Sequence, residues 1–129
     1  MNNANFSVTF RSSSRELSAR EKLKMKDVSD AVKIDEVTNE SPLIITPIGY
    51  AILDVHNEKS DSKDYHTYVI EDKDGERYYT GSEPFWESFS EIWDVMSDSD
   101  EALGTWQIKA YKKDSKNYKG KKFLTCSIA

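Results

Sequence analysis

The chain has 129 residues, of which 32% are charged, and a formal net charge of −5. This length is typical of a single domain with a sizeable core, and a single cysteine excludes an internal disulfide. No apolar run approaches the roughly 20 residues that a membrane-spanning helix needs, and the start of the chain lacks the apolar core of a signal peptide. We therefore expect an intracellular, soluble protein that does not associate with membranes.

Charge is segregated along the chain. Residues 1–33 carry a net +3, residues 34–108 a net −14 and residues 109–129 a net +6. A positive strip at the end of the chain can act locally on an anionic ligand although the whole molecule is acidic. For the acidic middle segment alone, a solubilising surface is the simplest interpretation.

Residues 1–41 are the least regular part of the sequence, and we predict a partly structured N-terminal arm. Apolar and polar residues alternate over 6–10, which is typical of a short strand, and residues 14–26 are rich in helix formers with Ser14 as the N-cap. The arm carries cations at Arg11, Arg15, Arg20, Lys22, Lys24 and Lys26. It can pack on the main domain, mediate assembly with a second subunit, or follow the phosphates of a nucleic acid.

A long strand is predicted over residues 43–56, where β-branched and apolar side chains are densest. Such a strand is too long to remain flat. Pro47 and Gly49 interrupt it, and a bend or bulge there would let one strand serve two sides of a small barrel.

Two shorter strands are predicted over residues 65–71 and 76–80. Asp74-Gly75 between them is a typical hairpin turn signal, and the polar loop 57–64 joins them to the long strand. The three predicted strands are therefore consecutive and antiparallel.

The clearest element is an amphipathic helix over residues 82–96. Ser82 can accept a hydrogen bond from an unpaired amide of the first turn, and Pro84 lies where a helix loses no hydrogen bond to proline. Apolar residues recur at spacings of three and four: Phe85, Trp86, Phe89, Ile92, Trp93 and Met96. Such a helix must bury one face, and we expect it to plug one end of the β-structure.

Two more strands are predicted after the helix, over residues 105–113 and 122–128. Alternation assigns one face of both strands to the core, namely Trp106, Ile108, Ala110, Leu124, Cys126 and Ile128. The opposite face carries Gln107, Lys109, Tyr111, Lys113, Phe123, Thr125 and Ser127.

The order of three strands, one helix and two strands is that of the oligonucleotide-binding (OB) barrel. We therefore predict a mainly β chain with one core helix, an α+β fold in which residues 42–129 form a five-stranded OB-like barrel of order β-β-β-α-β-β. Residues 1–41 form the N-terminal arm of this domain.

The sequence contains no combination of residues typical of an enzyme or of a metal site. Two histidines, His56 and His66, and one cysteine cannot supply the clustered ligands of a structural zinc site. Asp54 and His56 alternate on a strand and are best interpreted as neighbours on one face, and Cys126 as a small core residue. No glycine-rich phosphate loop or nucleophile motif is present, so we predict no catalysis, no cofactor and no metal.

Aromatic rings and lysines are interleaved near the end of the chain. Single-stranded nucleic acid offers base faces on which rings stack and phosphates that lysines neutralise. We predict a nucleic-acid-binding surface made by this segment, by the loop at 57–64 and by tyrosines of the intervening strands. Its residues are Lys59, Lys63, Tyr65, Tyr79, Lys109, Tyr111, Lys113, Lys116, Tyr118, Lys119, Lys121, Lys122 and Phe123. For any one of them the alternative is structural, because lysines protect edge strands and aromatic residues on strands usually pack.

Four stretches of the chain resemble a known family: GYAILDVHNEKS at 49–60, YTGSEPFW at 79–86, SKNYKGK at 115–121 and FLTCSI at 123–128. They are similar to small single-stranded DNA-binding proteins of bacteriophages and of mobile elements of Gram-positive bacteria. The resemblance covers most of residues 6–129. It implies an OB barrel that protects single strands during phage or mobile-element DNA replication or recombination, in the cytoplasm of a bacterial host. Bacterial single-strand binders usually end in a flexible acidic tail that recruits partners, whereas this chain ends in a predicted strand, so such recruitment is not expected.

Two interpretations of function therefore compete. The first is a non-enzymatic, largely sequence-independent binder of single-stranded DNA, with replication or recombination proteins as candidate partners and an oligomer through the N-terminal arm as one option. The second is an acidic protein-interaction module or phage-encoded inhibitor that mimics nucleic acid, favoured by the net charge of −14 over residues 34–108. A structural phage protein is a third option. The choice between DNA and RNA is open, because sugar contacts are not visible in a sequence.

Overall fold

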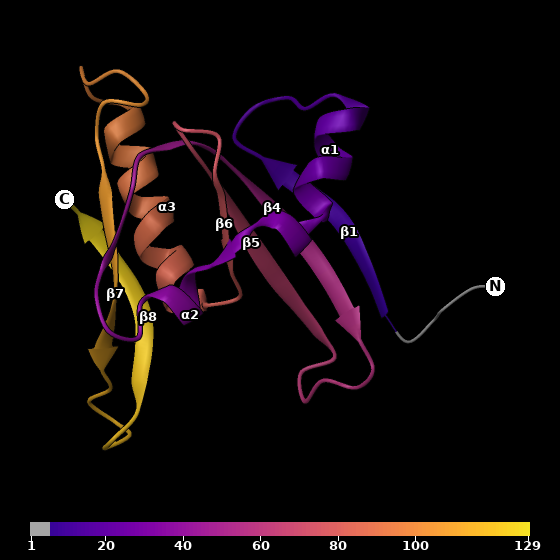
Figure 1. Cartoon of the computed structure of the whole chain (residues 1–129), viewed down its shortest axis with the longest axis vertical. Coiled ribbons are helices and arrows are strands. Elements are labelled where there is room, and N and C mark those ends of the chain that lie inside the picture. The colour runs from indigo at the N-terminus through magenta and orange to yellow at the C-terminus, as the bar shows by residue number, and fades with distance from the viewer. Residues whose placement is uncertain (1–5) are drawn as a thin grey trace.

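The structure, a computed structural model, describes residues 6–129 and contains two β-sheets and three α-helices (Figure 1). In spatial order the large sheet consists of β1 (Phe6–Ser13), β4 (Pro47–Asn57), β5 (Asp64–Asp72), β6 (Arg77–Thr80) and β2 (Val32–Lys33). The small sheet consists of β3 (Leu43–Ile45), β7 (Ile108–Asp114) and β8 (Lys122–Ile128). Neighbouring strands are antiparallel except β2 and β6, which are parallel. The chain is thus a mixed α+β protein in which strands predominate, as predicted.

The helices are α1 (Ala19–Lys26), α2 (Ile34–Val37) and α3 (Glu83–Ser97), with a 3-10 turn at Val28–Asp30. None of the helices in this described part of the chain is long and apolar enough to cross a membrane. The hydroxyl oxygen of Ser82 accepts from the Phe85 amide at 3.2 Å, so the predicted cap of α3 is confirmed. The same hydroxyl donates to the carbonyl oxygen of Leu124 at 3.1 Å, which also joins the start of α3 to β8.

The N-terminal segment belongs to the large sheet. β1, which alternation over 6–10 predicts, pairs along its length with β4. The helix predicted from Ser14 begins instead at Ala19, with Ser18 as its N-cap. Ser14 is unavailable as a cap because it continues the pairing with β4: its amide donates to the carbonyl oxygen of Tyr50 at 3.0 Å, and its hydroxyl oxygen accepts from the Tyr50 amide at 2.9 Å.

The strand predicted over 43–56 is two strands, β3 and β4, that belong to different sheets. β3 pairs with β7 and β4 pairs with β5, so the chain crosses from the small sheet to the large one at Thr46. The pairing of β4 with β5 shifts its register between Pro47 and Gly49. The predicted interruption at these two residues is therefore confirmed.

The buried carboxylate of Asp72 stabilises both this crossing and the turn between β5 and β6. One of its oxygens accepts from the Thr46 amide and the other from the Asp74 amide, each at 2.8 Å. In the same turn Gly75 has a φ of 90°, a conformation that favours glycine, and its amide donates to the Asp72 carbonyl oxygen at 2.9 Å. The predicted Asp74-Gly75 hairpin is confirmed.

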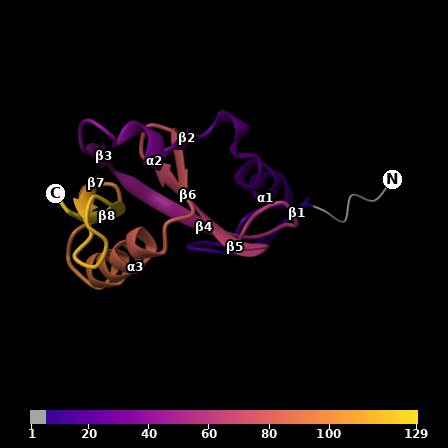
Figure 2. The same ribbon diagram turned by 90° about the horizontal axis from the view of Figure 1, so that it is seen from below.

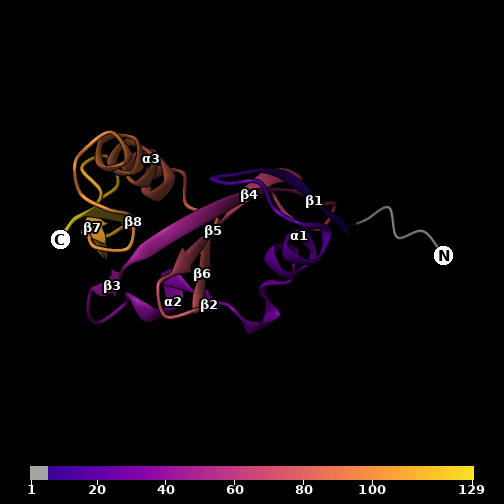
Figure 3. The same ribbon diagram turned by 90° about the horizontal axis from the view of Figure 1, so that it is seen from above.

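The large sheet is buried on both faces. One core cluster lies between the two sheets and α3 and consists of Ile34, Ile45, Ile70, Phe85, Phe89, Trp106, Ile108, Ala110, Leu124 and Cys126. The other lies on the face that carries α1 and consists of Leu17, Met25, Ala51, Leu53 and Val69. Because side chains alternate along a strand, Ile70 and Val69 of β5 enter different clusters. Figures 2 and 3 show α3 on one face of β4 and β5 and α1 on the other.

The predicted core positions are confirmed for Trp106, Ile108, Ala110, Leu124 and Cys126, which are all buried. The prediction for Ile128 is wrong: this side chain is 49% exposed, because it ends an edge strand and a groove separates it from Val95 of α3. Thr125, predicted to face outward, is buried because Ser88 of α3 covers it, with the two hydroxyl oxygens 3.1 Å apart. α3 therefore packs along the free edge of β8.

Neither sheet closes into a barrel within the described residues. Closure would require the free edges of β6 and β8 to pair with each other. β6 pairs instead with β2, where Val32 lies opposite Tyr78 and Lys33 opposite Tyr79, and α3 covers the edge of β8. The order predicted for residues 42–129 is observed except that the first strand is divided into β3 and β4, and the predicted closed five-stranded barrel is not observed.

We expect Asp72→Ala to lower the free energy of unfolding by roughly 3 kcal/mol, because it leaves two backbone amides without their charged acceptor. Asp72→Asn keeps one oxygen acceptor and should cost less. Urea denaturation measures both losses, with Asp61→Ala in the exposed β4–β5 loop as a matched control that changes stability little. A loss below about 1 kcal/mol for Asp72→Ala would mean that the crossing holds without this carboxylate.

Candidate nucleic-acid interface

A groove of about 290 Å³ lies on the face of the large sheet that carries α1. Its walls include the rings of Phe6, Tyr65 and Tyr79 and the side chains of Lys26 and Lys33. We call this the tyrosine groove. Phe6 is 49% exposed and both tyrosines are half-buried, so all three residues are partly open to solvent.

Strand alternation and pairing bring these side chains together. Tyr65 and Val69 point to the same face of β5, and Val69 lies opposite Tyr79 of β6. Lys33 of β2 lies opposite Tyr79 on the other side of β6. The short parallel strand β2 therefore delivers a cation to the groove.

The tyrosine groove offers both groups that a single strand requires, rings for base stacking and ammonium groups for phosphates. Tyr79 also packs against the core cluster on the α1 face. Its ring therefore has a structural role as well. Tyr65 and Tyr79, both predicted as binding residues, lie in one concave surface.

The β7–β8 hairpin contains most of the other predicted residues. Lys113 lies opposite Phe123, and alternation puts Lys109 and Tyr111 on the same outer face of the small sheet. The Lys109 ammonium lies 5.4 Å from the centre of the Tyr111 ring, a cation–π contact. Tyr118, in the loop between the strands, is 68% exposed. Rings and cations thus alternate over this surface as well.

The lysines at the tip of this hairpin are exposed, namely Lys116, Lys119 and Lys121 in the loop and Lys122 at the start of β8. Lys112 is different, because its ammonium donates to the carbonyl oxygen of Asp35 at 2.8 Å and to the side-chain oxygen of Asn39 at 2.9 Å. It ties β7 to the segment around α2 and is not free for a ligand.

The β4–β5 loop carries the remaining two predicted lysines. Lys59 is exposed, and the Lys63 ammonium lies 3.3 Å from a Glu58 carboxylate oxygen. An exposed ion pair of this kind is weak, so Lys63 can exchange it for a phosphate. Figure 1 shows the β4–β5 and β7–β8 loops at the same end of the molecule. The predicted residues thus form three groups, in the tyrosine groove, the hairpin and this loop.

Sequence reasoning missed Phe6 and Lys33 as groove residues, and it named Lys26 only among the arm cations that can follow phosphates. Alternation places Phe6 on a strand but does not say which strand lies beside it. Lys26 is the last residue of α1 and Lys33 the last residue of β2, two short elements whose docking is decided by contacts far away in the sequence. Only the excess of cations before residue 34 hints at their role.

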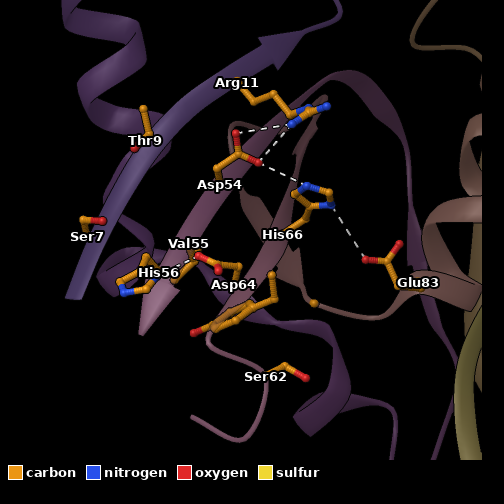
Figure 4. A pocket seen from close by; sticks show the side chains of 12 residues that line it. Ser7, Thr9, Arg11, Asp54, Val55, His56, Ser62, Asp64, His66 and Glu83 are labelled. Atoms are coloured by element: carbon orange, nitrogen blue, oxygen red, sulfur yellow. Dashed lines mark hydrogen bonds and ion pairs between the residues drawn. The ribbon is translucent and has the colours of Figure 1, made fainter. Parts of the chain in front are cut away.

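Histidines and carboxylates gather on the opposite face of the large sheet, around a cavity of about 700 Å³ (Figure 4). His66 Nε2 lies 3.1 Å from a carboxylate oxygen of Asp54, and the Arg11 guanidinium lies 3.3 Å from the same oxygen. Glu83, at the start of α3, accepts from the Tyr68 hydroxyl at 2.7 Å and lies 3.8 Å from His66 Nδ1. We call this the histidine network. Its members pair with one another across β1, β4, β5 and α3.

The second histidine has separate partners. His56 Nδ1 lies 2.7 Å from an Asp64 carboxylate oxygen, and its Nε2 lies 3.0 Å from a Glu58 carboxylate oxygen. The bond to Asp64, followed by that to Glu58, raises the pKa of His56 above its ordinary value. Asp54 and His56 therefore bind different groups. Across residues 6–129 no group of three or more His, Cys, Asp or Glu is arranged to hold a metal ion.

Cys126 is buried, and its thiol lies 3.9 Å from the Phe85 carbonyl oxygen. Burial raises the pKa of this thiol to about 12, so the thiol stays protonated at neutral pH. The interpretation of Cys126 as a core residue is confirmed.

Known proteins add no information about this site. Comparisons of the chain with protein-family models, with curated proteins and with solved structures found no match.

His56 should make stability depend on pH. Because its pKa is raised in the folded state, protonated His56 stabilises the fold below its unfolded pKa of about 6.5, and this contribution is lost as the pH rises through the higher folded pKa. His56→Gln removes the effect. The difference in melting temperature between the wild-type protein and this variant should be positive at acidic pH and shrink in alkaline buffer, and a difference independent of pH would contradict it.

Proposed function

We propose that the protein binds single-stranded DNA with little sequence preference and without chemistry on the strand, using the tyrosine groove and the β7–β8 hairpin. The observation that carries this proposal is the meeting of Tyr65 and Tyr79 with Phe6, Lys26 and Lys33 in one groove. Stacking on such rings contributes ~1–3 kcal/mol per base and tolerates any sequence, because every base has a flat face. Lys26 and Lys33 of the groove and the lysines of the hairpin would neutralise the phosphates of the strand.

We infer that the two sheets are an open relative of the OB barrel. The order β6-β5-β4 continues through the crossing at Thr46 into β3-β7-β8, and α3 lies between β6 and β7 in the chain. In OB barrels the nucleic acid lies on the second and third strands and between two loops. By order these strands correspond to β5 and β6, and the loops to β4–β5 and β7–β8. The position of the tyrosine groove on β5 and β6 supports this assignment.

The acidic composition of the chain does not oppose binding. α3, which carries Glu83, Glu87, Glu91 and Asp94, lies on the face of the large sheet opposite to α1 (Figures 2 and 3). The tyrosine groove lies on the α1 face. The sheet therefore separates these carboxylates from phosphates bound at the groove. Residues 109–129, which form the hairpin, contain seven lysines and only one acidic residue, an aspartate.

We propose phage or mobile-element DNA replication or recombination, in the cytoplasm of a bacterial host, as the biological setting. The support is the resemblance of residues 49–60, 79–86 and 115–128 to single-strand binders of such elements. The choice of DNA over RNA rests on the same resemblance. Replication or recombination proteins are the candidate protein partners.

The proposal is tested by fluorescence anisotropy of a labelled poly-thymidine strand of about 30 nucleotides, long enough for one or more OB-type sites. Binding should weaken steeply as salt is raised, because phosphate contacts release counterions. Matched RNA and DNA strands decide the sugar preference. Absence of binding at low salt would contradict the proposal, and capture of a basic nucleic-acid-binding enzyme without any affinity for strands would favour the inhibitor that mimics nucleic acid.

Tyr65 should contribute by stacking. Tyr65→Ala should weaken the binding of poly-thymidine by ~1–3 kcal/mol with little change in salt dependence, and Tyr65→Phe, which keeps the ring, should bind as the wild-type protein does. The pair is measured by the same titration, with thermal unfolding as a check on the fold. Equal affinity of the alanine and phenylalanine variants would exclude stacking at this position.

The hairpin lysines should contribute by charge. Replacing Lys116, Lys119 and Lys121 together by glutamine should reduce affinity most at low salt and shrink the salt slope by about 0.7 for each lost contact with a single strand. Lys73→Gln is the control, because this exposed lysine lies in the β5–β6 turn, at the opposite end of β5 from the β4–β5 loop. A triple variant with an unchanged slope would remove the hairpin from the interface.

A further inference from the structure

An apolar groove of about 180 Å³ lies between the C-terminal half of α3 and the end of β8. It is lined by Glu91, Ile92, Val95, Met96 and Ile128, and we call it the α3 groove. Val95 is 62% exposed and Ile128 49% exposed. Four apolar side chains from two elements thus form one surface open to water.

All charged side chains of the helix that forms this groove are acidic. Between residues 78 and 108 the sequence has no lysine or arginine. Its acidic residues there are Glu83, Glu87, Glu91, Asp94, Asp98, Asp100 and Glu101. Glu87, Glu91 and Asp94 are exposed, and none of the three forms an ion pair among residues 6–129. Their charge is available to a cationic partner.

We propose that the α3 groove is a docking site for a basic amphipathic helix of a partner protein. Aliphatic side chains of that helix would fill the space between Val95, Met96 and Ile128, and its lysines or arginines would face Glu91 and Asp94. An apolar centre with a charged rim is the usual arrangement of a helix-binding groove. The acidic rim selects a basic partner and repels phosphates.

A second copy of this chain fits the groove less well. This chain has two cationic segments. The loop of the β7–β8 hairpin, at 115–121, contains lysines and Tyr118 but no aliphatic side chain to fill an apolar groove. The basic helix α1 exposes one large aliphatic side chain, Leu23, because Met25 is buried against the large sheet. Either segment would satisfy the charge of the groove but would leave most of the apolar surface of Val95, Met96 and Ile128 exposed. The proposed helix supplies both the positive charge and the aliphatic side chains that the groove requires.

The α3 groove and the tyrosine groove lie on different sides of the large sheet. α3 packs against the core cluster between the sheets, whereas the tyrosine groove adjoins the cluster on the α1 face. A partner helix and a DNA strand can therefore be bound at the same time. This inference does not depend on strand binding.

The probe is a labelled synthetic peptide of about five helical turns, roughly 18 residues, with leucine on one face and lysine on the other. A peptide of the same composition in scrambled order is its control. We expect the full chain to bind the amphipathic peptide about tenfold more tightly than the scrambled one, measured by fluorescence anisotropy. Val95→Ser combined with Ile128→Ser should abolish this preference without changing the weaker, charge-driven binding of the scrambled peptide.

Leu103→Ser is the matched control, because it removes a side chain that is 53% exposed and lies outside the α3 groove; the preference should persist. Equal binding of the two peptides, or an unchanged preference in the double serine variant, would overturn the proposal. So would self-association of the wild-type protein that the double variant abolishes, which would assign the groove to a second copy. Poly-thymidine binding by the same variants should be unchanged, so loss of peptide binding alone separates this inference from the proposed function.

Discussion

The crossing of the chain at Thr46 from the small sheet into the large one is the constraint on which the rest of the fold depends. Because β3 and β4 are nearly continuous, the two sheets meet at a fixed place and enclose a space that α3 fills. Tyr50, just past the crossing, contacts the rings of Trp86, Phe89 and Trp93 with centroids 5.0, 6.0 and 5.2 Å away. Such edge-on aromatic contacts add to the burial of each ring. The crossing and the helix therefore stabilise each other.

This arrangement gives the large sheet two different faces, and alternation along β5 separates them. Tyr68 points toward α3 and stacks on Trp86 with centroids 4.6 Å apart, whereas its neighbours on the opposite face line the tyrosine groove or the α1 core. The histidine network lies at the N-terminus of α3, on the same face of the large sheet as α3, and its polar groups pair with one another. The large sheet thus separates the carboxylates of α3 from Lys26 and Lys33 of the tyrosine groove, as the proposed binding of phosphates at that groove requires.

The sequence predicts those features whose signals are local. Ser82 caps α3, Asp74-Gly75 makes its turn, and alternation finds the buried side chains of β7. It fails where distant contacts decide. Ser14 pairs with Tyr50, 36 residues away, and so cannot cap a helix. β2 has two residues and no hydrophobic period, yet by pairing with β6 it occupies the edge that a closed barrel would need.

In the candidate site, too, local patterns predict some of the residues and distant contacts decide the others. Alternation indicates that Tyr65 shares a face with Val69, and pairing of β5 with β6 adds Tyr79. Phe6 and Lys33 reach the groove only because β1 and β2 dock on opposite edges of the large sheet, and no local pattern specifies that docking.

The most direct test of the central claim is a titration of isotope-labelled protein with a short poly-thymidine strand, followed by the NMR chemical shifts of its backbone amides. The account predicts that the largest changes occur at Tyr65, Tyr79 and Lys33 and in the β7–β8 loop, while amides around Val95 stay unchanged. Changes confined to α3, or changes at the hairpin with none in the tyrosine groove, would contradict it.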